Sequence, residues 1–287
     1  MVSATQLSSY LYCPRKLFIN SVLKIEEPPK EALVKGKIWH QTYEFLNKSD
    51  AILVKSIKRN NYQEIYEIYK RKYATLLRNS IIIYQSELKM FEIKLIDMFS
   101  EYWPNFDAEA KLRALNLSEF ISKNKVFGEE LWEKLDPKIL SEKYYKSEKL
   151  NLSGIIDMIE VHNNNFYVPV EIKTGKVPNK GMWDGHRIQL AAYILLLEDA
   201  GNTTGEGYLK YKGVEDKRIL AMNSILKEEV LNLIKKVSTI ISNFVVPDYV
   251  DNKNKCTSCV HKELCYNAEE INNLIIRAKN TKTTIKE

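Results

Sequence analysis

The sequence predicts an α/β protein in which helices flank a β-sheet. Between Gly36 and Gly128 there is no glycine, and apolar residues recur at the three- and four-residue spacing of amphipathic helices. From Lys138 the apolar residues instead follow the two-residue spacing of strands, interrupted by turn residues. Strand-like and helix-like segments then alternate as far as Pro247. This order is typical of a sheet covered by helices, so we expect one α/β core with a helical insertion.

The N-terminal half is predicted to be mainly helical. A short helical pattern runs into Cys13, and helical spacing resumes after a loop that contains two prolines. Because the residue before a proline disfavours the helical conformation, Trp103-Pro104 is expected to end one of the long helices. We interpret residues 1–48 as an N-terminal helical segment and residues 49–135 as a helical insertion or lid.

Residues 136–246 are predicted to form the core of the fold, and residues 247–287 a cysteine-rich C-terminal segment. The core begins with two apolar strands joined across a His-Asn-Asn-Asn sequence, which is a strong hairpin signal. The expected strands are Leu150–Glu160, Phe166–Lys173, Gly207–Tyr211 and Lys217–Ala221. The expected helices are Gln189–Glu198 and Ser224–Phe244.

The composition is that of a globular protein, with 45% hydrophobic and 28% charged residues. The formal net charge of +6 favours a polyanionic partner, because clustered lysine and arginine release counterions from a phosphate backbone. No run approaches the ~18 apolar residues that a membrane span needs. The N-terminus lacks the basic region and apolar core of a secretory signal. We therefore expect a cytoplasmic protein with no membrane partner.

Two carboxylates and a lysine lie in the apolar strands of the core. Asp157 ends the sequence Gly-Ile-Ile-Asp, and Glu171 and Lys173 lie in Val-Glu-Ile-Lys. Carboxylates in buried strands are costly unless a divalent cation neutralises them. Strand alternation places Glu171 and Lys173 on one face, where the lysine can orient a water that the cation activates. The alternative is an ordinary solvated strand, since Glu-x-Lys alone is common by chance.

Four cysteines occur, three of them in the pattern C-x2-C-x5-C at Cys256, Cys259 and Cys265. In a cytoplasmic protein such clustering indicates a metal site rather than disulfides. Two thiolates on a short C-x2-C loop can converge on one metal, and the third follows after about one more turn. The fourth ligand is either Cys13, near the other end of the chain, or His261, which would complete a Cys₃His zinc site.

The order of these motifs resembles the CRISPR-associated RecB-like exonuclease family of the PD-(D/E)xK nucleases. The shared elements span Ser8 to Cys265. Along the chain they are C-P-R-K, G-x-x-x-H, G-x-x-D, E-x-K, Q-x-x-x-Y and C-x2-C-x5-C. Two departures are visible: Ile156 replaces the family's proline before the aspartate, and the long stretch 49–135 leaves the shape of the substrate open. The sequence has no G-x-x-x-x-G-K-[ST] phosphate loop, so it contains no helicase motor.

The resemblance implies a restriction-endonuclease-like core, a mixed sheet flanked by helices, and an iron–sulfur clasp that joins the N- and C-terminal segments. It implies Mg²⁺ or Mn²⁺ held by His40, Asp157, Glu171 and the carbonyl of Ile172. Catalysis is then expected from Asp157, Glu171 and Lys173, with Glu142 as a weaker acid before the first core strand. A [4Fe–4S] cluster is expected on Cys13, Cys256, Cys259 and Cys265, and DNA contacts are expected from Gln189, Tyr193 and Arg15.

The function implied is an exonuclease that acts on single-stranded or frayed DNA ends, 5′ to 3′, in CRISPR spacer acquisition. Its expected partners are DNA and a CRISPR integrase complex, and a homo-oligomer is compatible with the sequence. Two alternatives stay open: a nuclease of recombination, repair or viral replication, and a DNA-binding scaffold with little cleavage. The intact Asp157, Glu171 and Lys173 set disfavours the scaffold, because a scaffold has no need for buried acids.

Overall fold

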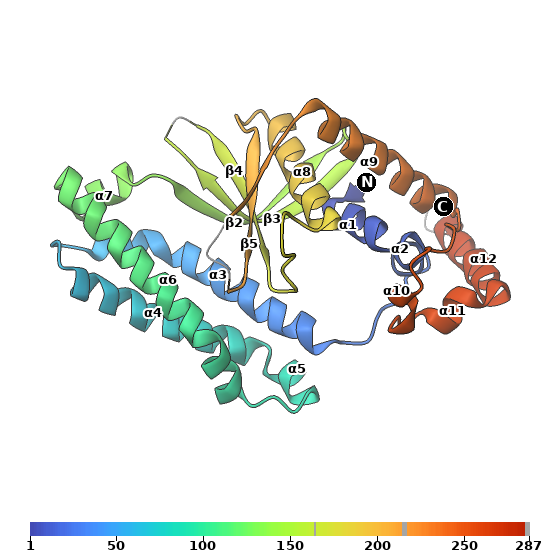
Figure 1. Cartoon of the computed structure of the whole chain (residues 1–287), viewed down its shortest axis with the longest axis horizontal. Helices are drawn as coiled ribbons and strands as arrows, with labels where there is room; N and C mark the ends of the chain where they lie inside the picture. The colour runs from blue at the N-terminus through green and yellow to red at the C-terminus, as the bar shows by residue number, and fades with distance from the viewer. Residues whose placement is uncertain (164, 214–216, 285–287) are drawn as a thin grey trace.

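A mixed β-sheet lies at the centre of the protein (Figure 1), a computed structural model that describes residues 1–163, 165–213 and 217–284. In this part of the chain the sheet has six strands in the order β1-β3-β4-β5-β6, with β2 also paired to β3. The β2–β3, β3–β4 and β5–β6 pairs are antiparallel, whereas β1–β3 and β4–β5 are parallel. The strands are β1 (Val2–Ser3), β2 (Lys138–Ser147), β3 (Leu152–Val161), β4 (Tyr167–Lys173), β5 (Glu206–Tyr211) and β6 (Arg218–Ala221).

Helices cover both faces of this sheet, as the sequence predicts. One face packs against α3 (Glu31–Ser56), α4 (Tyr62–Ile83), α6 (Leu95–Asn124) and α7 (Gly128–Lys134), which follow one another in the first half of the chain. The opposite face packs against α1 (Ala4–Tyr12), α8 (Asp184–Asp199) and α9 (Ser224–Asn243). Among the described residues, no helix is long and apolar enough to cross a membrane. The predicted α/β fold with a mixed sheet flanked by helices is confirmed.

The two ends of the chain meet beside the sheet (Figure 1). Here α2 (Pro14–Ser21) shares an apolar core with the end of α9 and with α12 (Ala268–Thr284). The short helices α10 (Asn254–Thr257) and α11 (Lys262–Tyr266) lie between α9 and α12 in the sequence. Phe18, Ile240 and Ile271 are buried in this contact, so apolar packing holds the two ends together whatever else they bind.

The helical stretch 49–135 is part of the main body of the protein. Its buried side chains, such as Tyr69 and Phe106, belong to the same apolar core as Val170 and Ile172 of β4. This core is continuous from α4 and α6, through α3, to the sheet. The helices therefore bury the central part of this face of the sheet, next to the strands that carry the predicted acids.

One local prediction is wrong, and one strand was not predicted. Pro104 does not end a helix, because α6 continues through it to Asn124, with Tyr102 and Phe106 buried on either side. The packing of that face outweighs the loss of one helical hydrogen bond. The break comes earlier, after the short helix α5 (Gln85–Met90), where Glu92 adopts a left-handed φ of 57°. Glu142 does precede the expected strand Leu150–Glu160, but it lies inside a further strand, β2, that the sequence does not predict.

Candidate functional site

The site begins where strands β3 and β4 separate. Their pairing runs from Val161–Tyr167 to Met158–Val170, and Asp157 and Glu171 are the next residues on the two strands. The backbone N–H of Ile172 donates a hydrogen bond of 2.8 Å to Oδ2 of Asp157. A side chain thus satisfies the donor that the separating strand has left behind. This divergence opens a place for two carboxylates in the middle of an otherwise apolar sheet.

The two-residue alternation of side chains is interrupted on β2 at Glu142 and on β3 at Asp157, which lie opposite each other. We call this interruption the slip. Ile156 and Ile159 both pack in the core under α8, although they are three positions apart, while Met158 packs in the core on the opposite face. On β2, Glu142 has a left-handed φ of 50°, which is costly for a residue with a side chain. The slip places Asp157 and Glu142 together on the face of the sheet that α3 crosses.

His40 reaches this pair from α3. Its Nδ1 atom lies 3.3 Å from Oδ1 of Asp157. Ligand atoms of His40, Glu142 and Asp157 all lie within 4.8 Å of one another, as expected of a metal site. The helix approaches closely because of Gly36, where a Cβ atom would lie only 3.3 Å from Oγ1 of Thr174. The G-x-x-x-H spacing therefore has a geometric basis, with a glycine at the close approach and a histidine one turn later.

A second set of polar side chains surrounds Glu171. Its Oε1 atom accepts from Nζ of Lys173 at 2.7 Å and from Nε2 of Gln189 at 2.7 Å. Oε1 of Gln189 accepts from Nζ of Lys173 at 2.9 Å, and its Nε2 donates to the Tyr193 hydroxyl at 2.8 Å. Tyr193 packs over Gly154, where a Cβ atom would lie 2.8 Å from its ring. Gln189 and Tyr193 of α8 thus hold Glu171 and Lys173 of β4 in place through hydrogen bonds.

The acids carry more charge than their surroundings stabilise. Burial and the charge of Asp157 raise the pKa of Glu142 to about 7. The same two causes raise the pKa of Glu171, against the opposing charge of Lys173. Burial lowers the pKa of His40, but the hydrogen bond and charge of Asp157 outweigh it and leave that pKa raised. Burial is the larger cause for the two glutamates, and the negative charge of Asp157 contributes to all three pKa shifts, so a bound cation would offset the repulsion among the acids.

The donor set fits a divalent cation. Oε2 of Glu171 is buried and has no hydrogen-bond partner among the described residues, which is costly unless the atom binds something else. Carboxylate oxygens with one imidazole suit Mg²⁺ or Mn²⁺. The geometry differs in one respect from the predicted ligand set of His40, Asp157 and Glu171, since the atoms that gather most closely include Glu142. The predicted contribution of the Ile172 carbonyl stays a prediction.

The three residues predicted to contact DNA are Gln189, Tyr193 and Arg15, and all three are buried. Gln189 and Tyr193 are buried, so they hold Glu171 and Lys173 rather than face a ligand. Arg15 is also buried; its guanidinium donates to the carbonyls of Pro247 and Cys265 at 3.0 and 2.9 Å and stacks 3.9 Å from the ring centroid of Tyr249. These contacts tie the N-terminal helices to the C-terminal segment and do not favour a DNA contact for Arg15.

Sequence reasoning missed His186. It lies in the first turn of α8, with Nδ1 3.0 Å from the hydroxyl of Tyr211. Burial and the charge of Lys173 lower its pKa to about 4, so the ring is neutral at pH 7. A lone histidine two residues after Asp184 carries no motif, and nothing in the sequence distinguishes it.

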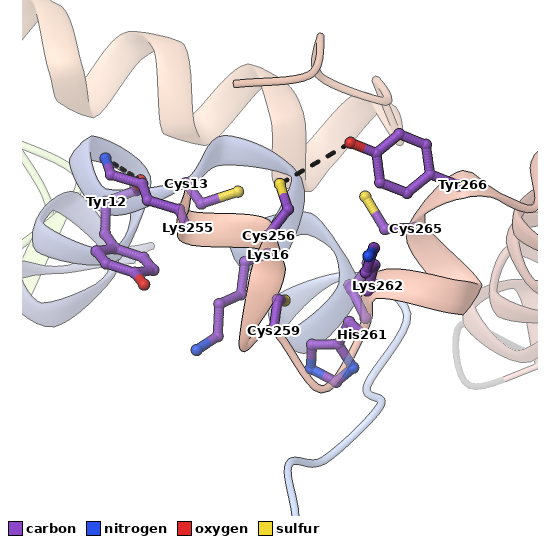
Figure 2. Close-up of a pocket in the computed structure, with 11 residues that line it drawn as sticks. Tyr12, Cys13, Lys16, Lys255, Cys256, Cys259, His261, Lys262, Cys265 and Tyr266 are labelled. Carbon is purple, nitrogen blue, oxygen red and sulfur yellow. Dashed lines mark hydrogen bonds between the residues drawn. The ribbon is translucent and has the colours of Figure 1, made fainter. Parts of the chain in front are cut away.

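The four cysteines line one cavity between the two ends of the chain (Figure 2). Cys13 lies between α1 and α2, and Cys256, Cys259 and Cys265 come from the α10–α11 region. Nζ of Lys255 donates to the carbonyl of Tyr12 at 2.8 Å, which closes the cavity from the C-terminal side. Burial raises the pKa of the Cys265 thiol, although the contact with Arg15 opposes the shift.

The cavity holds two candidates for the fourth ligand. A tetrahedral zinc ion with Zn–S bonds of about 2.3 Å needs its sulfurs about 3.8 Å apart. Among the described residues, no three cysteine or histidine ligand atoms in this cavity come within 4.8 Å of one another. His261 also lines the cavity, and its buried Nε2 finds no hydrogen-bond partner in the described part of the chain. The cavity thus offers both Cys13 and His261 as candidate fourth ligands beside Cys256, Cys259 and Cys265.

A mixed sheet with acids, a lysine and a histidine where two strands diverge defines a nuclease of the restriction-endonuclease-like class. The family model described as the PD-(D/E)XK nuclease superfamily matches residues 1–266, and the chain belongs to this superfamily. The C-P-R-K, G-x-x-x-H, G-x-x-D, E-x-K and Q-x-x-x-Y elements and the cysteines all lie within the matched residues.

Curated relatives match part of the chain. A CRISPR-associated exonuclease Cas4/endonuclease Cas1 fusion of Leptospira interrogans is 29% identical over 127 residues, covering 42% of this chain and 23% of the relative. A CRISPR-associated exonuclease Cas4 of Francisella tularensis subsp. novicida is 32% identical over 125 residues, covering 42% of this chain and 59% of the relative. The chain thus spans less than two thirds of each of these relatives. The solved structure described as "Crystal structure of SSO0001" is 15% identical, covers 78% of this chain and 96% of its own, and has a TM-score of 0.31, too low to bear on the fold.

Proposed function

We propose that this protein is a metal-dependent DNA exonuclease that degrades single-stranded or frayed ends, 5′ to 3′, during CRISPR spacer acquisition. The observation that carries the proposal is the gathering of His40, Glu142 and Asp157 within 4.8 Å. Glu171 and Lys173 lie on the strand next to Asp157, at the point where the two strands diverge. The names of the relatives support the CRISPR setting, and the fusion of Cas4 with an endonuclease in one of them supports an integrase partner.

The roles follow from the contacts. A bound Mg²⁺ or Mn²⁺ lowers the pKa of a water and balances charge on the phosphate oxygens. Asp157, His40, Glu142 and Glu171 would hold that ion, with Oδ2 of Asp157 kept in place by Ile172 N–H. Nζ of Lys173, bonded to both Glu171 and Gln189, would orient the attacking water or stabilise charge on the phosphate.

The four-cysteine cavity is proposed to hold a [4Fe–4S] cluster. When bound, such a cluster cross-links the chain ends through four thiolates. The cavity lies between the two ends, whereas the predicted cleavage residues come from α3, β3 and β4, so the role of the cluster is structural. It would add to the apolar contact of Phe18 and Ile271 that already joins these ends.

The test is degradation of a single-stranded oligonucleotide with Mn²⁺, using ends blocked at 5′ or 3′ in turn. Lys173→Ala should lose cleavage by at least ~10²-fold, since it removes an electrostatic group at the reacting phosphate, while DNA binding is retained. Lys143→Ala, an exposed lysine on β2, is the matched control and should cleave normally. Degradation that persists in excess EDTA, or an active Lys173→Ala, would overturn the proposal. Degradation blocked only by a modified 3′ end would reverse the polarity.

A further inference from the structure

Two large apolar side chains are exposed side by side next to the proposed metal site. Tyr144 and Ile155 are cross-strand partners on β2 and β3, and 60% and 52% of their surfaces are exposed. Directly opposed residues of an antiparallel pair have Cβ atoms about 5 Å apart, so the two side chains form one patch. Isolated exposed apolar residues need no explanation, but a joined pair in the middle of two strands does.

The patch lies on the same face of the sheet as the acids. Gly154, the neighbour of Ile155, faces Tyr193 of α8, and Tyr145, the neighbour of Tyr144, packs in the core under α8. Because strand neighbours point to opposite faces, Tyr144 and Ile155 point to the α3 side. Each is two residues from an acid of the site, Glu142 on β2 and Asp157 on β3, which is about 7 Å along the strand.

The helix that packs on this face, α3, leaves the patch uncovered. α3 contacts the strands at the acids, through His40 and Asp157, and beyond them through Asn47, which donates to Oγ of Ser141 at 2.7 Å. Both contacts lie on one side of Tyr144 and Ile155 along the strands. In the described part of the chain β2 pairs with β3 alone, so the patch lies at an open edge of the sheet. A ligand can therefore lie across the patch and reach the acids.

The chemistry of the patch suits an unpaired nucleobase. A tyrosine ring offers a flat face for stacking, and Ile155 widens that apolar surface; base–aromatic stacking tolerates any base. Lys146 lies two residues further along β2; it pairs with Glu148 at 3.4 Å, but 60% of its side chain is exposed, so it can also meet a backbone phosphate. A base that stacks here leaves a neighbouring phosphate within reach of the acids. A base inside a duplex presents only its edge, so the patch favours an unpaired base over the interior of a duplex.

We propose that Tyr144 and Ile155 form a base-binding subsite that stacks one unpaired nucleobase beside the phosphate to be cleaved. This subsite rests on the proposed nuclease function and gives a physical reason for preferring single-stranded or frayed DNA. Tyr144 is the principal contact, and Ile155 supports the edge of the bound base.

The first experiment measures binding without cleavage. A fluorescent single-stranded oligonucleotide is titrated into the full chain in EDTA. Tyr144→Ala should weaken binding by about tenfold or more, Tyr144→Phe should bind like wild type, and Ile155→Ala should lie between. Ile219→Ala is the matched control, because Ile219 is 67% exposed on β6, away from the site, and should bind normally. Equal affinity of Tyr144→Ala and wild type would overturn the subsite and leave the patch as a protein contact.

The second experiment places an abasic nucleotide at successive positions of the oligonucleotide. At one position beside the cleaved phosphate, wild type should show a raised KM with little change in kcat, and Tyr144→Ala should lose this sensitivity. A wild-type profile that is flat along the oligonucleotide would reject stacking. If wild type never cleaves but Tyr144→Ala still weakens binding in EDTA, the nuclease proposal fails and the subsite stands. The stabilisation by Mn²⁺ should be the same in Tyr144→Ala as in wild type, since Tyr144 holds no metal.

Discussion

The carboxylate of Asp157 accepts the backbone N–H of Ile172 through Oδ2, while Oδ1 faces Nδ1 of His40. One oxygen therefore serves the fold and the other serves the proposed ion. Ile172 is only 2% exposed, so its N–H has no route to solvent if Asp157 is removed. The two roles can be separated by the choice of substitution.

Asp157→Asn should keep the fold and lose the metal. The amide oxygen can still accept from Ile172, but the negative charge is gone, so the melting temperature should no longer rise when Mn²⁺ is added. Asp157→Ala should also lose the rise in melting temperature with Mn²⁺. In EDTA its free energy of unfolding should be about 1–3 kcal/mol lower than that of Asp157→Asn, because the Ile172 N–H is left unpaired. Thermal melts of both variants with and without Mn²⁺ measure this. Equal stability of the two variants in EDTA would show that the Ile172 hydrogen bond contributes nothing.

Metal affinity should depend on pH. Glu142 has a pKa of about 7 and the pKa of Glu171 is also raised, so a cation must displace protons from both at lower pH. The Mn²⁺ affinity measured by calorimetry should rise between about pH 6 and pH 8 and then level off, with proton release on binding. Glu142→Gln should weaken the affinity and flatten this rise. A wild-type affinity that is constant from pH 6 to pH 8 would contradict the proposed ligands.

The same shifts predict the opposite trend for the metal-free fold. A carboxyl group whose folded pKa lies above its ordinary value keeps its proton longer in the folded state than in the unfolded chain. Stability in EDTA should therefore fall as the pH rises from about 4.5 towards 7, and Glu142→Gln should reduce that fall. Urea unfolding at several pH values measures it. Stability that increases through this window in wild type but not in Glu142→Gln would mean that the pKa of Glu142 is lowered, not raised.

The cysteine cavity should hold iron and sulfide. The protein purified without oxygen should be brown, with broad absorbance near ~400 nm, and Cys13→Ser should lose the iron. Ser258→Ala, a change inside the C-x2-C loop that removes no ligand, is the control and should stay brown. Stoichiometric zinc without iron would reject the cluster. Zinc that is lost in His261→Ala but kept in Cys13→Ser would establish the Cys₃His alternative.

Gly154 should be intolerant of a side chain. A Cβ atom there would lie 2.8 Å from the ring of Tyr193, so Gly154→Ala should cost about 1–3 kcal/mol and displace the Gln189 contact with Glu171. Gly205→Ala is the control, since a Cβ atom at that position would meet no atom of the described residues within 4 Å. Urea unfolding and the cleavage rate together measure the effect. Normal cleavage by a destabilised Gly154→Ala would show that Tyr193 does not position the acid.

The core strands and the acids can be predicted from the sequence because their signals are local. The alternation around Glu171 and the hairpin before it are contained in a short stretch, and β3, β4 and α8 lie close to the expected ranges. The expectation for Pro104 is wrong because it considers only the residues next to the proline. The long buried face of α6 stabilises the helix by more than the loss of one backbone hydrogen bond at Pro104 destabilises it.

Other features cannot be read from the sequence because they depend on distant parts of the chain. The resemblance implies Glu142 only as a weaker acid, and its place beside Asp157 depends on the slip that β2 and β3 share at the same level, which no pattern in either strand predicts. The basic character of Arg15 suggests a DNA contact, yet its carbonyl partners lie more than two hundred residues away, at Pro247 and Cys265. The exposed pair of Tyr144 and Ile155 becomes visible only once the register of the strands is known.

The continuous core between the sheet and the helices of residues 49–135 limits how this nuclease can be shortened. Removing these helices to reach the size of a minimal family member would expose Val170 and Ile172, the apolar neighbours of Glu171, to water. A shorter descendant or an engineered miniature would need a new apolar cover for that face before its acids could hold their positions. The helices of residues 49–135 therefore support the acids through packing, even at residues that lie far from the site.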